Sequence, residues 1–325
     1  MILHNDEKAF KQAISYASDK LKILPIYIEK DYWVTYALKI LFSHSEISQY
    51  LVFKGGTSLA KCYELISRFS EDIDLVILRN NEETDNQSKK KIKAISEKLS
   101  KFLPEIEIDG ITHKKGKIRK TAHSYSRNFE GNFGQVREFI VLEATWLGYY
   151  EPYTQGEINS LIGKVLYENN QQELATLYEL CPFEIRVLDV KRTLCEKVMS
   201  LVRFSHDENP ISALQNKIRH LYDIHQILGN GKFEEFFNSS EFDEMLNKVA
   251  NDDVQSFKNN NDWIKYPPKN ALIFSDENVW ELLKPTYLNE FSKLIYGDLP
   301  KSSDISQTLT KLRNRISKVS WEIMM

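Results

Sequence analysis

The spacing of apolar residues predicts two helices at the start of the chain. Apolar side chains recur every three or four positions from Phe10 to Leu21 and again from Trp33 to Leu41, which is typical of helices with one buried face. Pro25 lies between the two periods, and proline does not fit the interior of a helix. We therefore expect a break at Pro25, with two helices preceding the segment that carries the clearest chemical pattern.

That segment is "LVFKGGTSLAKCYELISRFSEDIDLVIL", residues 51–78. Residues 51–53 form a short apolar run like a buried strand, and residues 57–67 have helical spacing. Residues 72–78 alternate between acidic and apolar positions and then become fully apolar, as a strand does. The pattern predicts a strand, a glycine turn, a helix and a second strand.

The middle of the chain predicts further strands. Residues 79–92 are polar and lack an apolar period, so we expect a loop that leads into a helix reaching residue 102. Residues 105–113 and 115–126 alternate as two strands would, and residues 137–147, "REFIVLEATWL", form the next strand-like run. Together with the earlier strands these segments predict a small mixed sheet.

The remaining chain predicts mostly helix. Residues 155–170 are expected to be helical, and residues 183–204 begin as a strand and continue as a helix. Helical spacing then dominates to the end, interrupted by "KYPPKN". The predicted class is α+β, with a small mixed sheet flanked by helices in a first domain, residues 1–185, and a mainly helical second domain, residues 186–325.

Composition narrows the functional classes. The net charge is −3, with 43 basic and 46 acidic residues, so the whole chain gives no electrostatic signal for nucleic acid. The three cysteines form no C-x-x-C pair, and there is neither a signal-peptide core nor an apolar run long enough for a membrane helix. P-loop, zinc and Ser–His–Asp spacings are also missing. We expect a cytoplasmic protein without a membrane partner.

Asp72 and Asp74 are the strongest candidates for chemistry. Successive side chains of a strand point to opposite faces, so these two carboxylates project from the same face while Ile73 points into the core. Two carboxylates this close repel each other unless one holds a proton or a cation compensates. Mg²⁺ or Mn²⁺ prefers such oxygen ligands. The pair therefore predicts a divalent metal site.

The preceding glycine turn predicts a phosphate site. Gly55 and Gly56 allow a phosphate to approach the backbone closely, and the following helix would direct free N–H groups at an anion, with Thr57 and Ser58 beside them. A phosphate held here, with its oxygens shared by a metal on the aspartate strand, suits attack on a nucleoside triphosphate. The order of residues therefore indicates phosphoryl or nucleotidyl transfer.

Other charged residues leave alternatives open. Glu143 is the acidic residue of the strand-like run at 137–147, so it is either a third carboxylate of the site or a strand-edge glutamate in water. Lys191 and Lys197 on one predicted helix, and Asp223 on another, have the spacing of solvated helical charges. Spacing alone assigns them no role.

Several motifs together resemble a known family. They are "IEKDYWVTYAL" at 28–38, "FKGGTSLAKCY" at 53–63, "RFSEDIDL" at 68–75, "IVLEA" at 140–144, "CEKV" at 195–198 and "IRHLYDI" at 218–224. The glycine motif followed by the D-x-D motif is specific as a pair. With these motifs the sequence resembles the AbiEii/AbiGii toxin family of nucleotidyltransferases, within the DNA polymerase β-like superfamily. Past about residue 230 we recognise no motif of that family.

The resemblance implies roles for individual residues. Asp72 and Asp74 would bind Mg²⁺ or Mn²⁺, with Glu143 as the third carboxylate. Lys197 would contact nucleotide phosphate, and Asp223 would complete the later motif. The triphosphate site implied by the resemblance consists of Lys54, Gly55, Gly56, Thr57, Ser58 and Lys61.

The resemblance also implies an activity and partners. It implies transfer of a nucleoside monophosphate from a nucleoside triphosphate to an RNA, such as tRNA, or to a protein acceptor. The expected setting is the toxin half of a toxin–antitoxin or phage-defence (abortive infection) pair, with a cognate antitoxin protein as partner. Two alternatives remain: a degenerate module that binds nucleotide or a partner without catalysis, and D-x-D chemistry on a sugar nucleotide, which leaves the glycine turn unexplained.

Overall fold

The computed structural model describes the chain except for residues 81, 132–135, 149, 257–261 and 322–325. It divides into two compact units. Unit 1 consists of Met1–Glu64, Phe69–Trp146 and Tyr153–Val187, and unit 2 consists of Leu65–Arg68, Leu147–Pro152 and Leu188–Met325. Unit 1 therefore ends near residue 185, where the sequence predicts a domain boundary, although two short segments of unit 2 interrupt it. The division into domains at residue 185 stays a prediction.

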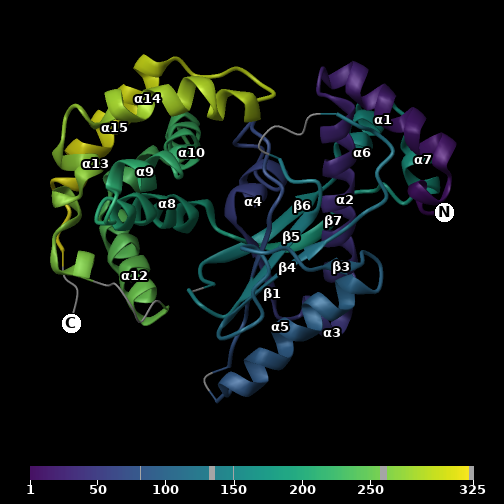
Figure 1. Cartoon of the computed structure of the whole chain (residues 1–325), viewed down its shortest axis with the longest axis horizontal. Helices are drawn as coiled ribbons and strands as arrows, with labels where there is room; N and C mark the ends of the chain where they lie inside the picture. Colours follow the sequence, from purple (N-terminus) through teal and green to yellow (C-terminus); the bar gives the residue numbers. More distant parts are fainter. Residues whose placement is uncertain (81, 132–135, 149, 257–261, 322–325) are drawn as a thin grey trace. The chain divides into compact units, whose positions relative to one another are not determined.

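The described part of unit 1 is built on a seven-stranded mixed sheet in the order β3-β4-β5-β2-β1-β7-β6 (Figure 1). The strands are β1 (Leu51–Lys54), β2 (Ile73–Ile77), β3 (Glu105–Ile106), β4 (Ile118–His123), β5 (Ile140–Thr145), β6 (Tyr153–Ile158) and β7 (Phe183–Leu188). In the centre, β2 runs antiparallel to β1 and parallel to β5. The two strands that carry the predicted carboxylates are therefore direct neighbours.

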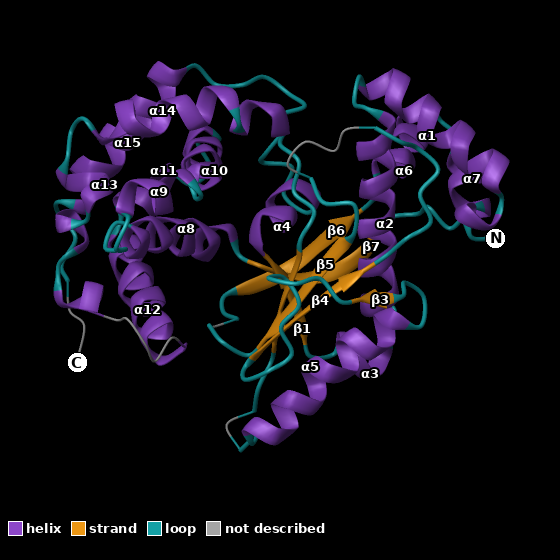
Figure 2. Ribbon diagram, in the orientation of Figure 1, coloured by secondary structure: helices purple, strands orange, loops and turns teal. Residues whose placement is uncertain are grey.

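Helices cover the apolar face of this sheet. Leu51, Phe53, Leu75 and Leu142 belong to the main hydrophobic core of unit 1 and are fully buried, and α5 contacts β2, β4, β5 and α2. Figure 2 shows the strands in orange with α2 and α5 beside them. The helices of unit 1 are α1 (Glu7–Leu21), α2 (Pro25–Phe42), α3 (Ser45–Ser48), α4 (Gly55–Lys61), α5 (Asp85–Ser100), α6 (Leu161–Glu168) and α7 (Gln172–Leu177), with a 3₁₀ turn at Leu3–Asn5.

Unit 2 is mainly helical in its described residues, as Figure 2 shows by colour. Its helices are α8 (Val190–Phe204), α9 (Pro210–Gln215), α10 (Ile218–Gly229), α11 (Glu234–Asn238), α12 (Ser240–Ser256), α13 (Leu272–Ser275), α14 (Val279–Asn289) and α15 (Ser302–Ile316). Short 3₁₀ turns at Asp262–Lys265, Pro268–Asn270 and Phe291–Leu294 separate some of them. The α10 helix packs on α8 and α15, which brings distant parts of this half together.

The α+β class, with a mixed sheet and a mainly helical second half, is confirmed. The predicted break at Pro25 is the start of a helix, because Pro25 is the first residue of α2, a position that needs no amide hydrogen. The described helices contain no segment long and apolar enough to cross a membrane.

Several predicted boundaries are wrong. The helix expected to reach residue 67 ends at Lys61, and Glu64 then adopts the left-handed region with φ 52°, so the chain turns although its apolar spacing continues. The loop expected up to residue 92 gives way earlier to α5, whose capping residue Thr84 hydrogen-bonds Gln87. Of the strand expected at 105–113, β3 covers only Glu105–Ile106.

The helix expected over 155–170 is two elements. The first half is strand β6, which ends at Ile158 and lies next to β7 in the sheet. Gly156 permits this close approach, because a Cβ there would lie 2.9 Å from Cγ1 of Val187 on β7. Only α6, from Leu161, is helical. The helical prediction was wrong for residues 155–158 because one helical spacing was read across a strand and the helix after it.

Candidate active site

A row of four charged residues crosses the centre of the sheet of unit 1. Lys54 on β1 is the register partner of Asp74 on β2, and Asp74 is the register partner of Glu143 on β5. Glu143 is in turn the partner of Lys120 on β4, whose Nζ lies 3.3 Å from Oε2 of Glu143. Two carboxylates therefore lie side by side with a lysine on each flank.

The carboxylates of Asp74 and Glu143 repel each other. Burial, followed by the charges of Glu143 and Asp72, raises the pKa of Asp74 to about 7, and the lysines Lys54 and Lys120 only partly offset this. Burial removes solvation from the charged form, and the neighbouring carboxylates repel it. A charged Asp74 therefore calls for a compensating cation at the site.

The glycine turn lies directly against Asp74. Helix α4 begins at Gly55, immediately after β1, and Gly55 has φ 81°, in the left-handed region that favours glycine. A Cβ at this position would lie 2.2 Å from Oδ2 of Asp74. Gly56 does not share the positive φ. The glycine that the local geometry requires is therefore Gly55, and its backbone lies beside the carboxylate predicted to bind metal.

The two hydroxyl residues after the glycines are buried and bonded within the protein. The Oγ1 of Thr57 donates to the carbonyl of Asp72 at 2.6 Å and lies 3.0 Å from Oγ of Ser70. The Oγ of Ser58 donates to the carbonyl of Gly55 at 2.8 Å. Thr57 thus fixes the backbone of Asp72 relative to α4. The predicted contact of Thr57 and Ser58 with triphosphate stays a prediction.

Asp72 is paired with an arginine that the sequence reasoning missed. The Nη1 of Arg137, in the segment before β5, donates to Oδ1 of Asp72 at 2.8 Å. The backbone N–H of Arg137 also donates to both carboxylate oxygens of Glu71, at 2.9 and 3.1 Å. The arginine therefore lies at the first aspartate of the D-x-D pair and is anchored through its main chain.

A buried lysine completes this anchor. The side chain of Lys30 on α2 has no exposed surface, and its Nζ lies 3.2 Å from Oε2 of Glu71. The same amine donates to the carbonyls of Arg137, at 2.7 Å, and Phe139. Lys30 and Glu71 together hold the segment that contains Arg137. This buried ion pair therefore positions the Arg137 side chain at the site.

Lys61, at the end of α4, forms a second ion pair with a residue of α2. Its Nζ lies 2.6 Å from Oδ1 of Asp31 and 2.7 Å from Oγ1 of Thr35, and Oδ2 of Asp31 accepts from the backbone N–H of Leu161 at 2.7 Å. Lys61 thus fixes the end of α4 to α2. Its predicted contact with nucleotide stays a prediction.

A sequence signal for these anchors existed. Glu29, Lys30 and Asp31 are three consecutive charged residues at the start of a largely buried helix. Glu29 accepts the backbone N–H groups of Asn128 and Phe129, at 2.7 and 3.1 Å. Each member of the triplet therefore fastens a different segment of unit 1. Charges inside an apolar helix are costly unless paired, so the triplet itself indicated partners, although not which ones.

The donor set fits a divalent metal ion. Asp74 and Glu143 supply hard carboxylate oxygens on neighbouring strands. The raised pKa of Asp74 means that its charged form is disfavoured without an additional cation. Within the described residues, no three His, Cys, Asp or Glu side chains form a ready-made cluster. Asp72 is bound to Arg137 and Glu143 to Lys120.

The later predicted residues meet in unit 2. Both carboxylate oxygens of Asp223 on α10 accept from Arg68, with Nε–Oδ1 2.6 Å and Nη2–Oδ2 2.7 Å. The Nζ of Lys197 on α8 lies 2.6 Å from the same Oδ2. Burial alone would raise the pKa of Asp223, but the two cations hold it well below its usual range. We call this group, Arg68, Lys197 and Asp223, the buried ion triad.

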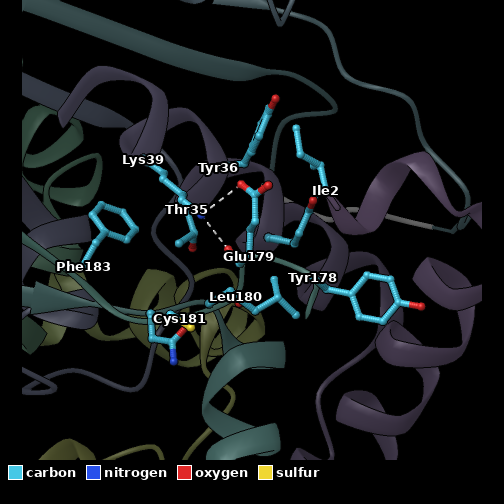
Figure 3. A pocket seen from close by; sticks show the side chains of 12 residues that line it. Ile2, Thr35, Tyr36, Lys39, Tyr178, Glu179, Leu180, Cys181 and Phe183 are labelled. Carbon is cyan, nitrogen blue, oxygen red and sulfur yellow. Dashed lines mark hydrogen bonds and ion pairs between the residues drawn. The ribbon is translucent and has the colours of Figure 1, made fainter. Parts of the chain in front are cut away.

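A hollow of unit 1 lies apart from these residues. It is partly open to solvent, has a cavity volume of about 30 Å³ beside α2, and contains none of the predicted site residues. Figure 3 shows Lys39 reaching Glu179, whose carbonyl accepts from Nζ at 2.7 Å. Its lining residues are Ile2, Tyr32, Thr35, Tyr36, Lys39, Asn159, Ser160, Tyr178, Glu179, Leu180, Cys181 and Phe183. Thr35, one of these lining residues, accepts from Nζ of Lys61 at 2.7 Å.

Comparison with known proteins shows that the chain matches a protein-family model. Residues 36–311 match the family model described as "Nucleotidyl transferase AbiEii toxin, Type IV TA system". The match covers most of the chain. It continues well past residue 230, beyond which the sequence shows no recognisable motif of the family. No curated protein matches the chain.

Proposed function

The chain belongs to the AbiEii nucleotidyltransferase toxin family of type IV toxin–antitoxin systems, and from this premise we propose a metal-dependent transfer reaction. The protein moves a nucleoside monophosphate from a nucleoside triphosphate to an acceptor, which is an RNA, with tRNA as one candidate, or a protein. In the transfer, the acceptor oxygen forms a bond to the α-phosphorus, and the bond to pyrophosphate breaks.

The observation that carries the proposal is the position of Gly55 beside Asp74, with Glu143 as the register partner of Asp74. Glycine at residue 55 lets the Asp74 carboxylate lie against the backbone at the start of α4, and the adjacent carboxylates are the ligands that Mg²⁺ or Mn²⁺ prefers. The residues that would hold the metal are Asp72, Asp74 and Glu143. A bound cation would neutralise charge on the reacting phosphates.

The residues of the chain divide the remaining work. Gly55 and Gly56 admit the phosphates to the start of α4, and Thr57 keeps Asp72 in register with them through its 2.6 Å hydrogen bond. Lys54 and Lys120 flank the carboxylates and offset part of the negative charge that a triphosphate adds. These groups bind and orient the substrate before transfer.

The family also supports a partner. Type IV toxin–antitoxin membership makes a cognate antitoxin protein part of this proposal, with growth arrest during phage infection as the setting and the cytoplasm as the compartment.

Labelling tests the function directly. The protein is incubated with each of the four α-³²P-labelled triphosphates, Mg²⁺ and a cell extract, and the label is sorted by sensitivity to RNase and protease. We expect label from at least one triphosphate in one macromolecular fraction, and its loss in Asp74→Asn. Asp109→Asn is the matched control, because Asp109 is an exposed turn residue that bonds only the adjacent Gly110 N–H in the described contacts.

The outcomes separate the functional classes. Label in RNA identifies an RNA acceptor, and label in protein identifies a protein acceptor. Triphosphate binding without label in any fraction would favour the degenerate binding module and contradict the proposed transfer.

A further inference from the structure

We propose that Arg137 holds Asp72 while the site is without metal and turns to the triphosphate when metal takes Asp72. Arg137 is then a positioning residue for the metal ligand and a binding residue for the polyphosphate. The inference rests on the proposed function, because it needs Asp72 to bind metal and the substrate to carry phosphates.

The contact between the two side chains is the first support. The Nη1 of Arg137 lies 2.8 Å from Oδ1 of Asp72, and the side chains are 33% and 26% exposed. A cation this close stabilises the charged carboxylate. A metal ion must therefore compete with the guanidinium for the same oxygen. Because both side chains reach solvent, the guanidinium has room to leave without rearrangement of the core.

The anchoring of Arg137 is the second support. Its backbone N–H donates to Glu71, and its carbonyl accepts from Lys30 at 2.7 Å. Glu71 and Lys30 are themselves paired at 3.2 Å. These contacts fix the main chain of Arg137. Its Nη1 also lies 3.4 Å from Oε1 of Glu71, farther than the 2.8 Å to Oδ1 of Asp72. The backbone is therefore held independently of the guanidinium, and the end of the side chain, which lies between two carboxylates, is the part that exchanges partners.

The charge of the substrate gives the exchanged partner. A triphosphate brings about four negative charges at neutral pH, which two divalent cations cannot balance together with three carboxylates. A guanidinium released from Asp72 would lie next to the incoming phosphates. Its planar fork of donors suits phosphate oxygens better than a lysine does. The ligand class is therefore the polyphosphate part of a nucleotide, independent of the base.

Metal titration without nucleotide tests the first half. Mn²⁺ is titrated into the full-length protein by calorimetry, with Arg137→Gln, Arg137→Lys and Arg127→Gln compared to the unchanged chain. We expect Mn²⁺ affinity to rise about threefold in Arg137→Gln, because a partly exposed ion pair that competes with the metal is removed. Arg127 is the matched control, since it is a nearby arginine whose Nη1 pairs with Glu138 at 2.7 Å, away from the carboxylate row.

Inorganic tripolyphosphate tests the second half. With saturating Mn²⁺, we expect Arg137→Gln to weaken tripolyphosphate binding about tenfold, whereas Arg137→Lys retains part of the affinity and Arg127→Gln all of it. The variants should fold, because the backbone N–H and carbonyl of Arg137 keep their bonds to Glu71 and Lys30, and Glu71 keeps Lys30 as its cation when the 3.4 Å contact with the guanidinium is lost. Thermal unfolding curves verify this.

Two results would overturn the inference. Unchanged or weaker Mn²⁺ affinity in Arg137→Gln would show that Arg137 does not compete for Asp72. Unchanged tripolyphosphate affinity would show that it does not move to the phosphates. If Mn²⁺ binding is lost in Asp74→Asn but equal in Arg137→Gln, only this inference fails. If Mn²⁺ binding does not depend on Asp74, the proposed metal site fails and the inference with it.

Discussion

The backbone of Gly55 lies so close to Asp74 that a Cβ at residue 55 would come within 2.2 Å of Oδ2. The glycine turn and the carboxylate strand therefore depend on each other. Residue 55 also has φ 81°, which side chains rarely adopt. The two glycines of the K-G-G-T-S motif consequently differ, since Gly56 does not have a positive φ.

We expect Gly55→Ala to lose both stability and activity. The new methyl group must displace the Asp74 carboxylate, and alanine at positive φ costs about 1 to 2 kcal/mol. Gly56→Ala should lower the melting temperature less, because residue 56 does not have a positive φ, and should weaken binding of triphosphate, because its methyl group obstructs the approach of phosphate. Differential scanning fluorimetry and titration calorimetry measure the two effects. Equal melting temperatures for the two variants would contradict the distinction.

We expect Asp74→Asn to stabilise the protein at neutral and alkaline pH without divalent metal. The pKa of Asp74 is raised to about 7, first by burial and then by Glu143 and Asp72. The folded protein thus holds a proton that the unfolded chain releases between the ordinary value and about 7, so stability falls as pH rises through that window. Asparagine removes this loss, and each kcal/mol gained raises the melting temperature by about 2 to 4 °C.

Melting curves across pH, with and without Mg²⁺, check this prediction. The difference between Asp74→Asn and the unchanged chain should shrink toward pH 4, where both are uncharged at residue 74. Mg²⁺ should stabilise the unchanged chain and leave the variant unaffected. A difference that grows as pH falls would show that the pKa of Asp74 is not raised.

Local patterns predicted two strands of the candidate site. Alternation predicted a strand carrying Asp72 and Asp74 on one face, and β2 begins at Ile73, one residue after Asp72. The apolar run around Glu143 predicted the strand that is β5. Their exact neighbourhood did not follow from the sequence. The register that pairs Asp74 with Glu143 joins segments about 70 residues apart, and strand order is a tertiary property that hydrophobic period alone does not fix.

The supporting contacts could not be predicted for the same reason. The Lys30–Glu71 and Lys61–Asp31 pairs join helix α2 to segments 30 or more positions away. A sequence shows that a buried charge needs a partner, but every acidic residue nearby is a candidate. The role of Lys61 illustrates this, since the family resemblance implied a contact with nucleotide while its amine is bonded to Asp31.

We expect Lys61→Met to destabilise unit 1. It would leave the mostly buried Asp31 carboxylate without its cation, although the N–H of Leu161 still donates to it. Breaking such a pair typically costs about 3 to 5 kcal/mol. Urea unfolding measures the loss, and the double variant Lys61→Met with Asp31→Asn should recover part of it. If Lys61→Met keeps full stability and loses only affinity for triphosphate, Lys61 contacts nucleotide as the family resemblance implies.

Asp223 lies at the centre of the buried ion triad. Asp223 is fully buried and accepts from Arg68 and Lys197 together. Lys191, on the same helix as Lys197, instead pairs with the exposed Glu241 at 3.2 Å. The two lysines of α8 thus differ in burial and in partner, which makes Lys191 the matched control for Lys197.

We expect Asp223→Asn to be the most destabilising change in the triad, by about 3 to 5 kcal/mol, because it leaves two buried cations without their carboxylate. Lys197→Met should cost less, since Arg68 still binds both oxygens of Asp223, and Lys191→Ala should change stability little. Urea unfolding gives the free energies, and labelled-triphosphate transfer gives the activities. If Lys197→Met abolishes transfer while its unfolding free energy stays close to that of Lys191→Ala, Lys197 acts on the nucleotide as the family resemblance implies. If transfer falls only in proportion to lost stability, the contribution of Lys197 is confined to the triad.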